Sequence, residues 1–164
     1  EGASRPGHFQ GVCNVVDRIF EIVKPTNAYF GQKDFQQTVV VKRLVEVTNS
    51  PIKINIVPIK REPHGLARSS RNVRLSEKGR QNAAFINKSL TQLKEDIEEM
   101  SLADAVAKAK QFISAQKGAR IDYLLAINST TLDEVSDMSE AEEIAVVTVV
   151  EYEGVRLLDN IILK

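Results

Sequence analysis

Hydrophobic residues recur at steps of three and four positions near the start of the chain, which predicts a helix from His8 to Val23. Lys24-Pro25 ends this helix, because proline cannot continue it. The run "NAYFG" at residues 27–31 is then predicted to be a short strand. A second helix is predicted over residues 33–49, although its run "TVVV" leaves a strand as the alternative. Residues 52–59, "IKINIVPI", alternate apolar and polar positions and predict a second strand.

The order helix, strand, helix, strand is typical of a parallel sheet, whose ligands collect at the carboxyl ends of the strands. A polar loop follows each predicted strand: "GQKD" comes after the first and "REPHGLARSSRN" after the second. Because two strands do not make a stable doubly wound sheet, we expect the chain to carry only part of one. Its opening "EGASRPGHF" also resembles a loop between elements more than a natural start.

A different pattern begins near residue 75. Helices are predicted from Ser76 to about Met100 and from Ser101 to near Gly118, with a capping serine before each. The strands "RIDYLLAIN", "EIAVVTVVEY" and "VRLLDNIIL" follow, and Glu153-Gly154 joins the last two as a hairpin. The predicted fold class is α/β. Part of a parallel-sheet domain occupies residues 1–73, and a small α+β domain of two helices and a three-stranded antiparallel sheet occupies residues 74–164.

Charge and cysteine content narrow the class of protein. Lys+Arg and Asp+Glu both number 22, so no overall field favours nucleic acid or an anionic membrane. No apolar run approaches the roughly 20 residues that span a bilayer, and the start has no signal-peptide core. Cys13 is the single cysteine, which excludes an internal disulfide. We therefore expect a cytoplasmic globular protein that binds neither nucleic acid nor membrane.

The loop after the first predicted strand offers candidate anion-binding groups. Lys33 and Asp34 lie past a glycine at the start of a predicted helix, where free backbone N–H groups favour anions. Lys33 would add a full positive charge, and Asp34 could accept a hydrogen bond from a ribose hydroxyl. A solvated Lys-Asp pair that caps the helix is the alternative. Gln36 or Gln37 could face a polar substrate, although exposed glutamines are common on helices.

The loop after the second predicted strand is the stronger candidate. Arg61, Arg68 and Arg71 lie close to Ser69 and Ser70 in the sequence, and guanidinium groups suit phosphate oxygens in bidentate geometry. A solvated charge cluster is the alternative.

The two histidines are weaker candidates. His8 could act as a general acid or base, but it is also a common residue at a helix start. His64 is predicted to lie at the surface, in a turn. No Ser/His/Asp triad, Walker loop or zinc-ligand spacing occurs in the sequence.

Three motifs taken together resemble the pantothenate synthetase (pantoate–β-alanine ligase) family: "RPGHFQGV", "AYFGQKDFQQ" and "REPHGLARSSRN", in this order and spacing. The tail "RLLDNIIL" is similar to the closing strand of the family. The resemblance implies a Rossmann-like domain that binds ATP and pantoate, followed by a small C-terminal domain. It also implies that pantoate attacks the α-phosphate of ATP to give pantoyl adenylate, from which β-alanine then displaces AMP.

The resemblance assigns roles to individual residues. ATP would be bound by Gly31, Gln32, Lys33, Asp34, Lys60, Arg68, Ser69, Ser70 and Arg71. The charge that develops on the leaving pyrophosphate would be stabilised by Lys33, Ser69, Ser70 and Arg71, which is catalysis without a protein nucleophile. Pantoate would be bound by Gln37 and Phe30. Mg²⁺ would arrive with ATP, with no protein ligand for it in this chain, and the full-length enzyme would be a homodimer.

Several departures from the family pattern limit the transfer of these roles. Lys60 and Arg68 stand where the family usually has apolar residues, and His64 stands where it usually has Asp. The family's catalytic histidines lie in a segment upstream of the motifs found here, so we expect the isolated chain to be inactive and to bind ATP weakly. Two other interpretations stay open: a non-enzymatic interaction or dimerisation module, and another adenylate-forming nucleotidyl transferase of the same superfamily.

Overall fold

The computed structural model describes residues 1–2 and 4–164 and divides into two compact units, Glu1–Pro58 and Ile59–Lys164. The division falls earlier than the boundary predicted from the sequence, between residues 73 and 74. The reason is that the loop after Pro58 belongs to the second unit: Leu66 is part of its core, and Arg61 is hydrogen-bonded to its last strand.

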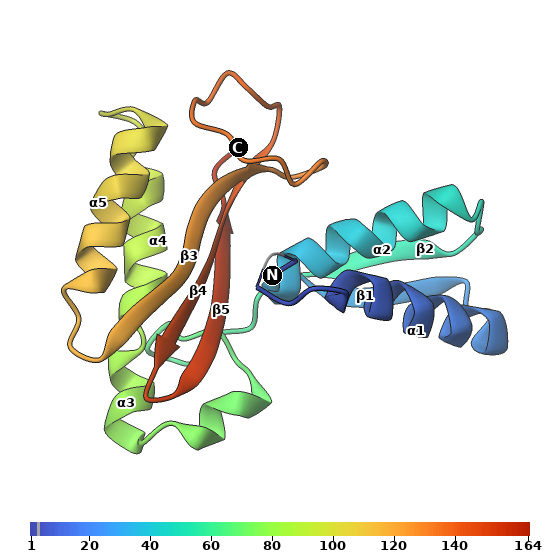
Figure 1. Cartoon of the computed structure of the whole chain (residues 1–164), viewed down its shortest axis with the longest axis horizontal. Helices are drawn as coiled ribbons and strands as arrows, with labels where there is room; N and C mark the ends of the chain where they lie inside the picture. Colours follow the sequence, from blue (N-terminus) through green and yellow to red (C-terminus); the bar gives the residue numbers. More distant parts are fainter. Residues whose placement is uncertain (3) are drawn as a thin grey trace. The chain divides into compact units, whose positions relative to one another are not determined.

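The first unit contains the predicted helix, strand, helix, strand order (Figure 1). Its elements are α1 (His8–Val23), β1 (Asn27–Gly31), the 3₁₀ turn η1 (Gln32–Asp34), α2 (Phe35–Val47) and β2 (Lys53–Val57). β1 and β2 are parallel, with Asn27 opposite Lys53 and Gly31 opposite Val57. α2 contacts both strands, and α1 packs against α2.

The run "TVVV" is helical, which excludes the strand alternative. Thr38 stabilises the first turn by donating its hydroxyl proton to the carbonyl oxygen of Phe35 at 2.7 Å. Phe35, Thr38 and Val41 are buried on one face of α2, at the spacing of three residues that a helix requires. Helical periodicity and burial thus outweigh the β-preference of the branched residues.

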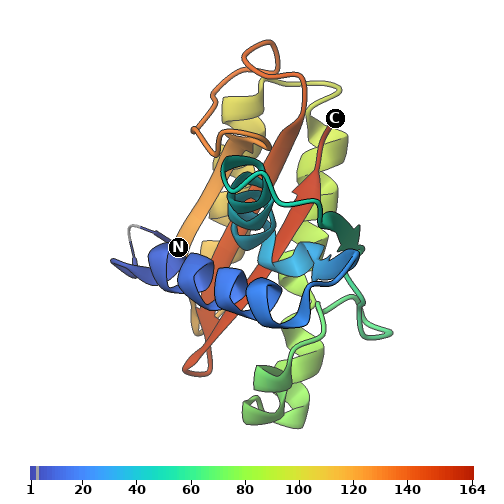
Figure 2. The ribbon, with the colours of Figure 1, turned by 90° about the vertical axis from the view of Figure 1, so that its right-hand side faces the viewer.

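The second unit is an α+β layer structure (Figures 1 and 2). Its helical segments are η2 (Ser70–Arg74), α3 (Glu77–Asn82), α4 (Phe85–Asp96) and α5 (Leu102–Ser114). β3 (Ala119–Asn128), β4 (Ile144–Tyr152) and β5 (Val155–Ile162) form an antiparallel sheet in the order β3-β4-β5. α4 and α5 cover one face of this sheet, as both views show.

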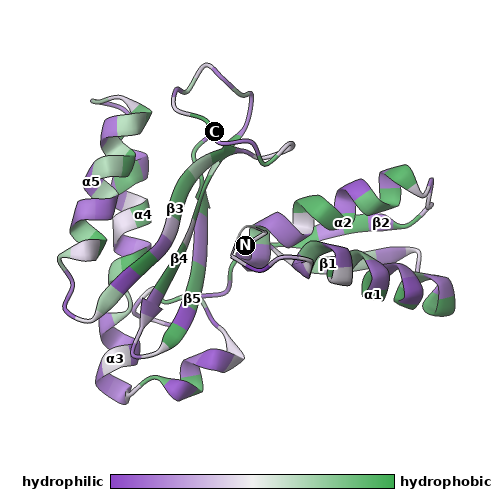
Figure 3. Ribbon diagram, in the orientation of Figure 1, coloured by the Kyte–Doolittle hydropathy of each residue, from purple (hydrophilic) through white to green (hydrophobic). Residues whose placement is uncertain are grey.

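The core of the second unit lies between these helices and the sheet. The strands are largely hydrophobic, whereas polar and apolar residues alternate on α4 and α5 (Figure 3). The largest side chains that are fully buried there include Ile86, Leu90, Leu93, Ile113, Leu124 and Ile144. At about 1.5–3 kcal/mol for each such side chain, this core is the main source of stability of the unit.

The predicted helix from Ser76 to Met100 is in fact two helices, so the unit has three helices and not two. α3 ends at Asn82, and a turn at Ala83–Ala84 leads into α4. The backbone N–H of Ala84 donates to the carbonyl of Gln81, and that of Ile86 donates to the carbonyl of Ala83. The helical hydrogen bonds thus change here from four-residue to three-residue spacing. Buried Ala83 and Ala84 fit the helical pattern on both sides, which is why the periodicity did not reveal the break.

Candidate functional site

The segment after β1 carries the first group of candidate residues. β1 ends at Gly31, and η1 turns the chain directly into α2. Gly31 has an extended backbone with φ −75°, and a Cβ built there would meet nothing within 4 Å. Its backbone conformation does not require glycine. The absence of a side chain at this position instead leaves the space over the turn open.

Lys33 and Asp34 form an ion pair in this turn. Lys33 Nζ lies 3.5 Å from Asp34 Oδ1, and the lysine is the less exposed of the two side chains. Asp34 occupies the N-cap position of α2 but makes no capping hydrogen bond. The helix-capping alternative for Asp34 is therefore not realised, and its carboxylate is exposed beside the start of the helix.

Gln37 lines an open pocket in the first unit, whose volume of ≈ 630 Å³ is within the range of about 300–1,000 Å³ found for small-molecule sites. The rest of the lining comes from residues 5–8 and from Gly11, Val12, Val15 and Val16 of α1. Gln36 is oriented differently, because its Oε1 accepts a hydrogen bond from the N-terminal amino group of Glu1 at 3.0 Å. Of the two glutamines, Gln37 is the one at the pocket.

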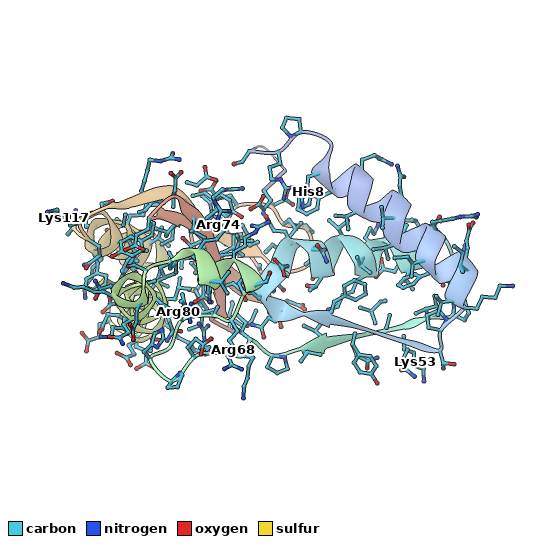
Figure 4. All side chains as sticks on the ribbon, turned by 90° about the horizontal axis from the view of Figure 1, so that it is seen from below. His8, Lys53, Arg68, Arg74, Arg80 and Lys117 are labelled. Atoms are coloured by element: carbon cyan, nitrogen blue, oxygen red, sulfur yellow. The ribbon has the colours of Figure 1, made fainter. Side chains whose placement is uncertain are left out.

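The polar groups of the pocket stand at the start of α1. His8 is its first residue (Figure 4), and its Nε2 lies 3.4 Å from Nη1 of Arg5. Val12, Val15 and Val16 belong to the apolar face of the predicted helix, but their place in a pocket lining was not predicted. The available signal was that His8, Gly11, Val12 and Val15 recur at helical spacing on one side. Phe30, predicted to bind pantoate, is half-buried on β1 and is not part of the pocket lining.

The second group of candidates lies in the second unit, in the arginine-serine segment Arg68–Arg71. Ser69 caps η2: its Oγ accepts a hydrogen bond from the backbone N–H of Arg71 at 3.2 Å. Ser70 and Arg71 are exposed on this 3₁₀ turn, and the Arg71 side chain has no hydrogen-bond partner in the described part of the chain. The turn therefore presents the Arg71 guanidinium and the Ser70 hydroxyl to solvent, while Ser69 is half-buried.

Arg68 differs from its neighbours because it is already paired. Its Nε and Nη2 donate to the two carboxylate oxygens of Glu62, at 3.1 and 3.4 Å. Its backbone N–H also donates to the carbonyl of Lys60, at 2.8 Å. Arg68 thus stabilises the loop in this structure. The Lys60 side chain is exposed, and its backbone carbonyl accepts the hydrogen bond from Arg68. Arg68 and Arg80 extend from this segment and from α3 (Figure 4).

The loop before the arginine-serine segment is tied to the sheet by a bidentate ion pair. Arg61 donates from Nη1 and Nη2 to the two carboxylate oxygens of Asp159 on β5, at 2.7 and 2.9 Å. The side chain of Asp159 is only 3% exposed. Arg61, considered above as an anion ligand, is therefore an anchor of the loop.

His64 is half-buried in the same loop, and its Nε2 is buried without a hydrogen-bond partner among the described residues. The predicted turn is confirmed, whereas the prediction of an exposed surface position is wrong, because the residue is half-buried. Gly65 follows it with φ 104°, a conformation for which glycine is the suitable residue. The turn is tight because Gly65 N donates back to the carbonyl of Glu62.

Within residues 1–2 and 4–164, no group of three or more His, Cys, Asp and Glu side chains is arranged to hold a metal ion. The same residues include no helix that is long and apolar enough to cross a membrane.

The sequence model of the family described as pantoate-beta-alanine ligase matches residues 1–162. The chain therefore belongs to the pantoate-beta-alanine ligase family. A pantothenate synthetase of Cytophaga hutchinsonii is 42% identical over 165 residues, which is 99% of this chain and 58% of that protein. The pantothenate synthetase of Acetivibrio thermocellus is also 42% identical, over 166 residues and with the same coverage.

Solved structures agree with this assignment. The crystal structure of pantothenate synthetase from Thermus thermophilus matches 98% of this chain and 58% of its own, with a TM-score of 0.91 and 39% identity. A Francisella tularensis pantoate-beta-alanine ligase, complexed with beta-gamma ATP and beta-alanine, matches 99% of this chain and 53% of its own, with a TM-score of 0.68 and 28% identity. The chain thus spans less than two thirds of the length of these relatives.

Proposed function

We propose that this chain is the C-terminal portion of an ATP-dependent ligase that condenses pantoate with β-alanine to give pantothenate, AMP and pyrophosphate. In the first step the pantoate carboxylate attacks the α-phosphorus of ATP and pyrophosphate leaves. In the second step the β-alanine amine attacks the acyl carbon of pantoyl adenylate and AMP leaves. The observation that carries the proposal is that Gln37, assigned to pantoate by its motif, lines a pocket of mixed polar and apolar character.

The chemistry of that pocket suits pantoate. Pantoate has a carboxylate and two hydroxyls around a carbon that bears two methyl groups. The valines of α1 offer apolar contacts to the methyl groups, while Arg5, His8 and Gln37 offer hydrogen-bond donors to the oxygens. A compact acid that is apolar on one side and polar on the other matches this arrangement.

We further propose that ATP is bound by the segments that follow β1 and β2. Gly31 and Val57 are paired at the carboxyl ends of the two parallel strands. The chain therefore leaves both strands at the end of the sheet where ligands of such sheets bind. Gly31, Gln32, Lys33 and Asp34 would contact ATP there, with Lys33 on the phosphates and Asp34 towards the ribose. Lys60, Arg68, Ser69, Ser70 and Arg71 would supply the remaining contacts.

Catalysis would rest on charge stabilisation. Lys33, Ser69, Ser70 and Arg71 would donate to the oxygens of the departing pyrophosphate, and Arg71 is exposed and without a partner in the part of the chain described here. Mg²⁺ would be carried by the ATP phosphates. A homodimeric, cytoplasmic enzyme completes the proposal, supported by the family resemblance and by the single cysteine.

A chimaera tests the proposal directly. This chain would replace the matching part of the Cytophaga hutchinsonii protein, which supplies the remainder of the length. We expect the chimaera to form pantothenate, AMP and pyrophosphate in equal amounts, Arg71→Ala to lower its kcat at least tenfold, and the 164-residue chain alone to be inactive. A folded chimaera without activity, beside an active Cytophaga protein, would refute the ligase proposal, and robust activity of the chain alone would refute the prediction of its inactivity.

A further inference from the structure

The N-terminus of α3 contains only one half of a capping box. Ser76 precedes the helix, and its Oγ accepts a hydrogen bond from the backbone N–H of Gly79 at 2.9 Å. In the complete motif, the residue three positions after the serine is Glu or Gln, and its side chain accepts from the serine backbone N–H. That position is Gly79 here, which has no side chain, so the N–H of Ser76 needs another acceptor.

Glu153 supplies this acceptor from the turn between β4 and β5. One of its carboxylate oxygens accepts from the backbone N–H of Ser76 at 2.8 Å, and the other accepts from Ser76 Oγ at 2.9 Å. A Cβ added at Gly79 would overlap the Glu153 carboxylate. The absence of a side chain at residue 79 therefore makes room for the carboxylate of Glu153, which lies 77 residues after Ser76 in the chain.

The backbone of the turn does not explain why residue 153 is a glutamate. Glu153 and Gly154 both have positive φ, 49° and 72°, as the two central residues of a tight hairpin do. Asn, Asp and Gly suit these positions better than Glu does. The reach of the glutamate side chain to Ser76 accounts for its presence.

We infer that Glu153 is a positioning residue, which clamps the β4–β5 turn to Ser76 and so holds the end of the segment that carries Ser69–Arg71. η2 runs from Ser70 to Arg74, and only Leu75 separates it from Ser76. The side chain of Leu75 is buried, and its N–H donates to the carbonyl of Asn72 at 3.2 Å. Fixing Ser76 therefore limits the movement of the whole 3₁₀ turn, while Arg61 and Asp159 hold the loop that precedes it.

The contact of Glu153 with Ser76 is an observation of the structure. The effect of this clamp on phosphate binding rests on the proposed function of the arginine-serine segment. An exchange of side chains tests both. Glu153→Asn keeps a residue suited to the turn but removes the long carboxylate side chain. Gly79→Glu places a carboxylate in the usual capping-box position, where it collides with Glu153. The double variant moves the carboxylate from residue 153 to residue 79.

Amide hydrogen exchange of residues 70–76 is the first measurement. We expect each single variant to raise the exchange rate of the Ser76 amide at least tenfold, and the double variant to return it to within a few-fold of wild type. The amides of residues 145–150 in the centre of β4 should exchange at the same rate in all four proteins. A Ser76 amide that is unaffected by Glu153→Asn, or a double variant with faster exchange than either single variant, would refute the clamp.

Binding of inorganic pyrophosphate, followed by the NMR shifts of residues 69–74, is the second measurement. We expect Glu153→Asn to weaken binding about fivefold and the double variant to restore it. If the exchange results hold but the affinity of Glu153→Asn equals that of wild type, the positioning role is wrong and the clamp is only structural. If the wild-type chain itself shows no NMR shifts with pyrophosphate, the proposal that the segment binds phosphate is refuted. The clamp is then judged by the exchange rates alone.

Discussion

The ion pair between Arg61 and Asp159 ties the loop before the arginine-serine segment to β5. Asp159→Asn would leave Arg61 without its charged bidentate acceptor; the Asp159 side chain is 3% exposed and the Arg61 side chain 26%. Because Arg61 keeps some contact with water, we expect a loss of about 2 kcal/mol in the free energy of unfolding, less than for a fully buried pair. Urea denaturation followed by circular dichroism measures this change.

Glu151→Gln is the matched control, because it also removes a carboxylate of the sheet that is paired with an arginine. The Arg120–Glu151 pair is exposed, and such pairs contribute about 0–1 kcal/mol. Equal losses in the two variants would contradict the anchoring role of Asp159.

Glu62 offers a test of whether Arg68 can serve as a phosphate ligand. In this structure the guanidinium of Arg68 donates two hydrogen bonds to the carboxylate of Glu62. Glu62→Gln removes the negative charge and frees the guanidinium, so we expect pyrophosphate to bind a few-fold more tightly. Glu77→Gln, an exposed carboxylate on α3, controls for the change in net charge. Tighter binding in both variants to the same degree would mean that Arg68 has no specific role.

At the scale of elements, the turn at residues 136–140 in the loop between β3 and β4 is held by hydrogen bonds to a carboxylate. Glu140 accepts from the hydroxyl of Ser136 at 2.7 Å and from the backbone N–H groups of Ser136 and Asp137 at 3.1 and 2.8 Å. These bonds, the one from the Ser136 hydroxyl first, lower the pKa of Glu140 below its ordinary value of 4.5. A lowered pKa in the folded state means that the stabilising contribution is complete above pH 4.5 and is lost as the pH falls through the folded value.

Glu140→Gln should therefore lower the melting temperature at pH 7, and the difference from wild type should shrink as the pH falls below 4.5. Thermal melts at several pH values between about 3 and 7 measure it. Glu142→Gln in the same loop is the control, because Glu142 is exposed and has no hydrogen bond among the described residues. A difference that stays constant over this pH range would contradict the role of the Glu140 carboxylate.

The elements themselves were largely predictable from the sequence. Periodicity and Lys24-Pro25 set both ends of α1, and Ser101 with Asp104 marked the start of α5, where Ser101 Oγ accepts from the Asp104 N–H. The break between α3 and α4 was not predictable, because Ala83 and Ala84 are good helix formers. The sequence motifs also named the candidate ligand-binding residues of the site. The pairing of Arg68 with Glu62 was not predictable, because it depends on the path of the loop, which local sequence patterns do not determine.

At the scale of the whole chain, the first unit leaves many apolar side chains uncovered. α1 has no buried residue, although its sequence is that of an amphipathic helix, and Ile22 is 68% exposed. Soluble monomers rarely expose contiguous apolar patches larger than a few hundred Å². Val15, Ile19 and Val23 are also exposed on α1. We therefore predict that the isolated chain self-associates in a concentration-dependent way.

Sedimentation velocity over a hundredfold range of concentration tests this prediction. We expect Ile19→Asp combined with Ile22→Asp to shift the chain towards monomer, because both substitutions place charge on the apolar face. Gln10→Asp combined with Asn14→Asp adds the same charge on the polar face and should have little effect. A wild-type chain that is monomeric throughout the range would contradict the prediction.

Binding of pantoate to the pocket of the first unit is the most direct test of the central claim. The measurement is a titration of the chain with pantoate, followed by the methyl signals of Val12, Val15 and Val16 and the side-chain amide of Gln37. We predict saturable shifts confined to this pocket and an affinity about tenfold weaker in Gln37→Leu, with Gln10→Leu unchanged. Absence of shifts in the wild-type chain, or shifts that are the same in Gln37→Leu, would contradict the assignment of this pocket to pantoate.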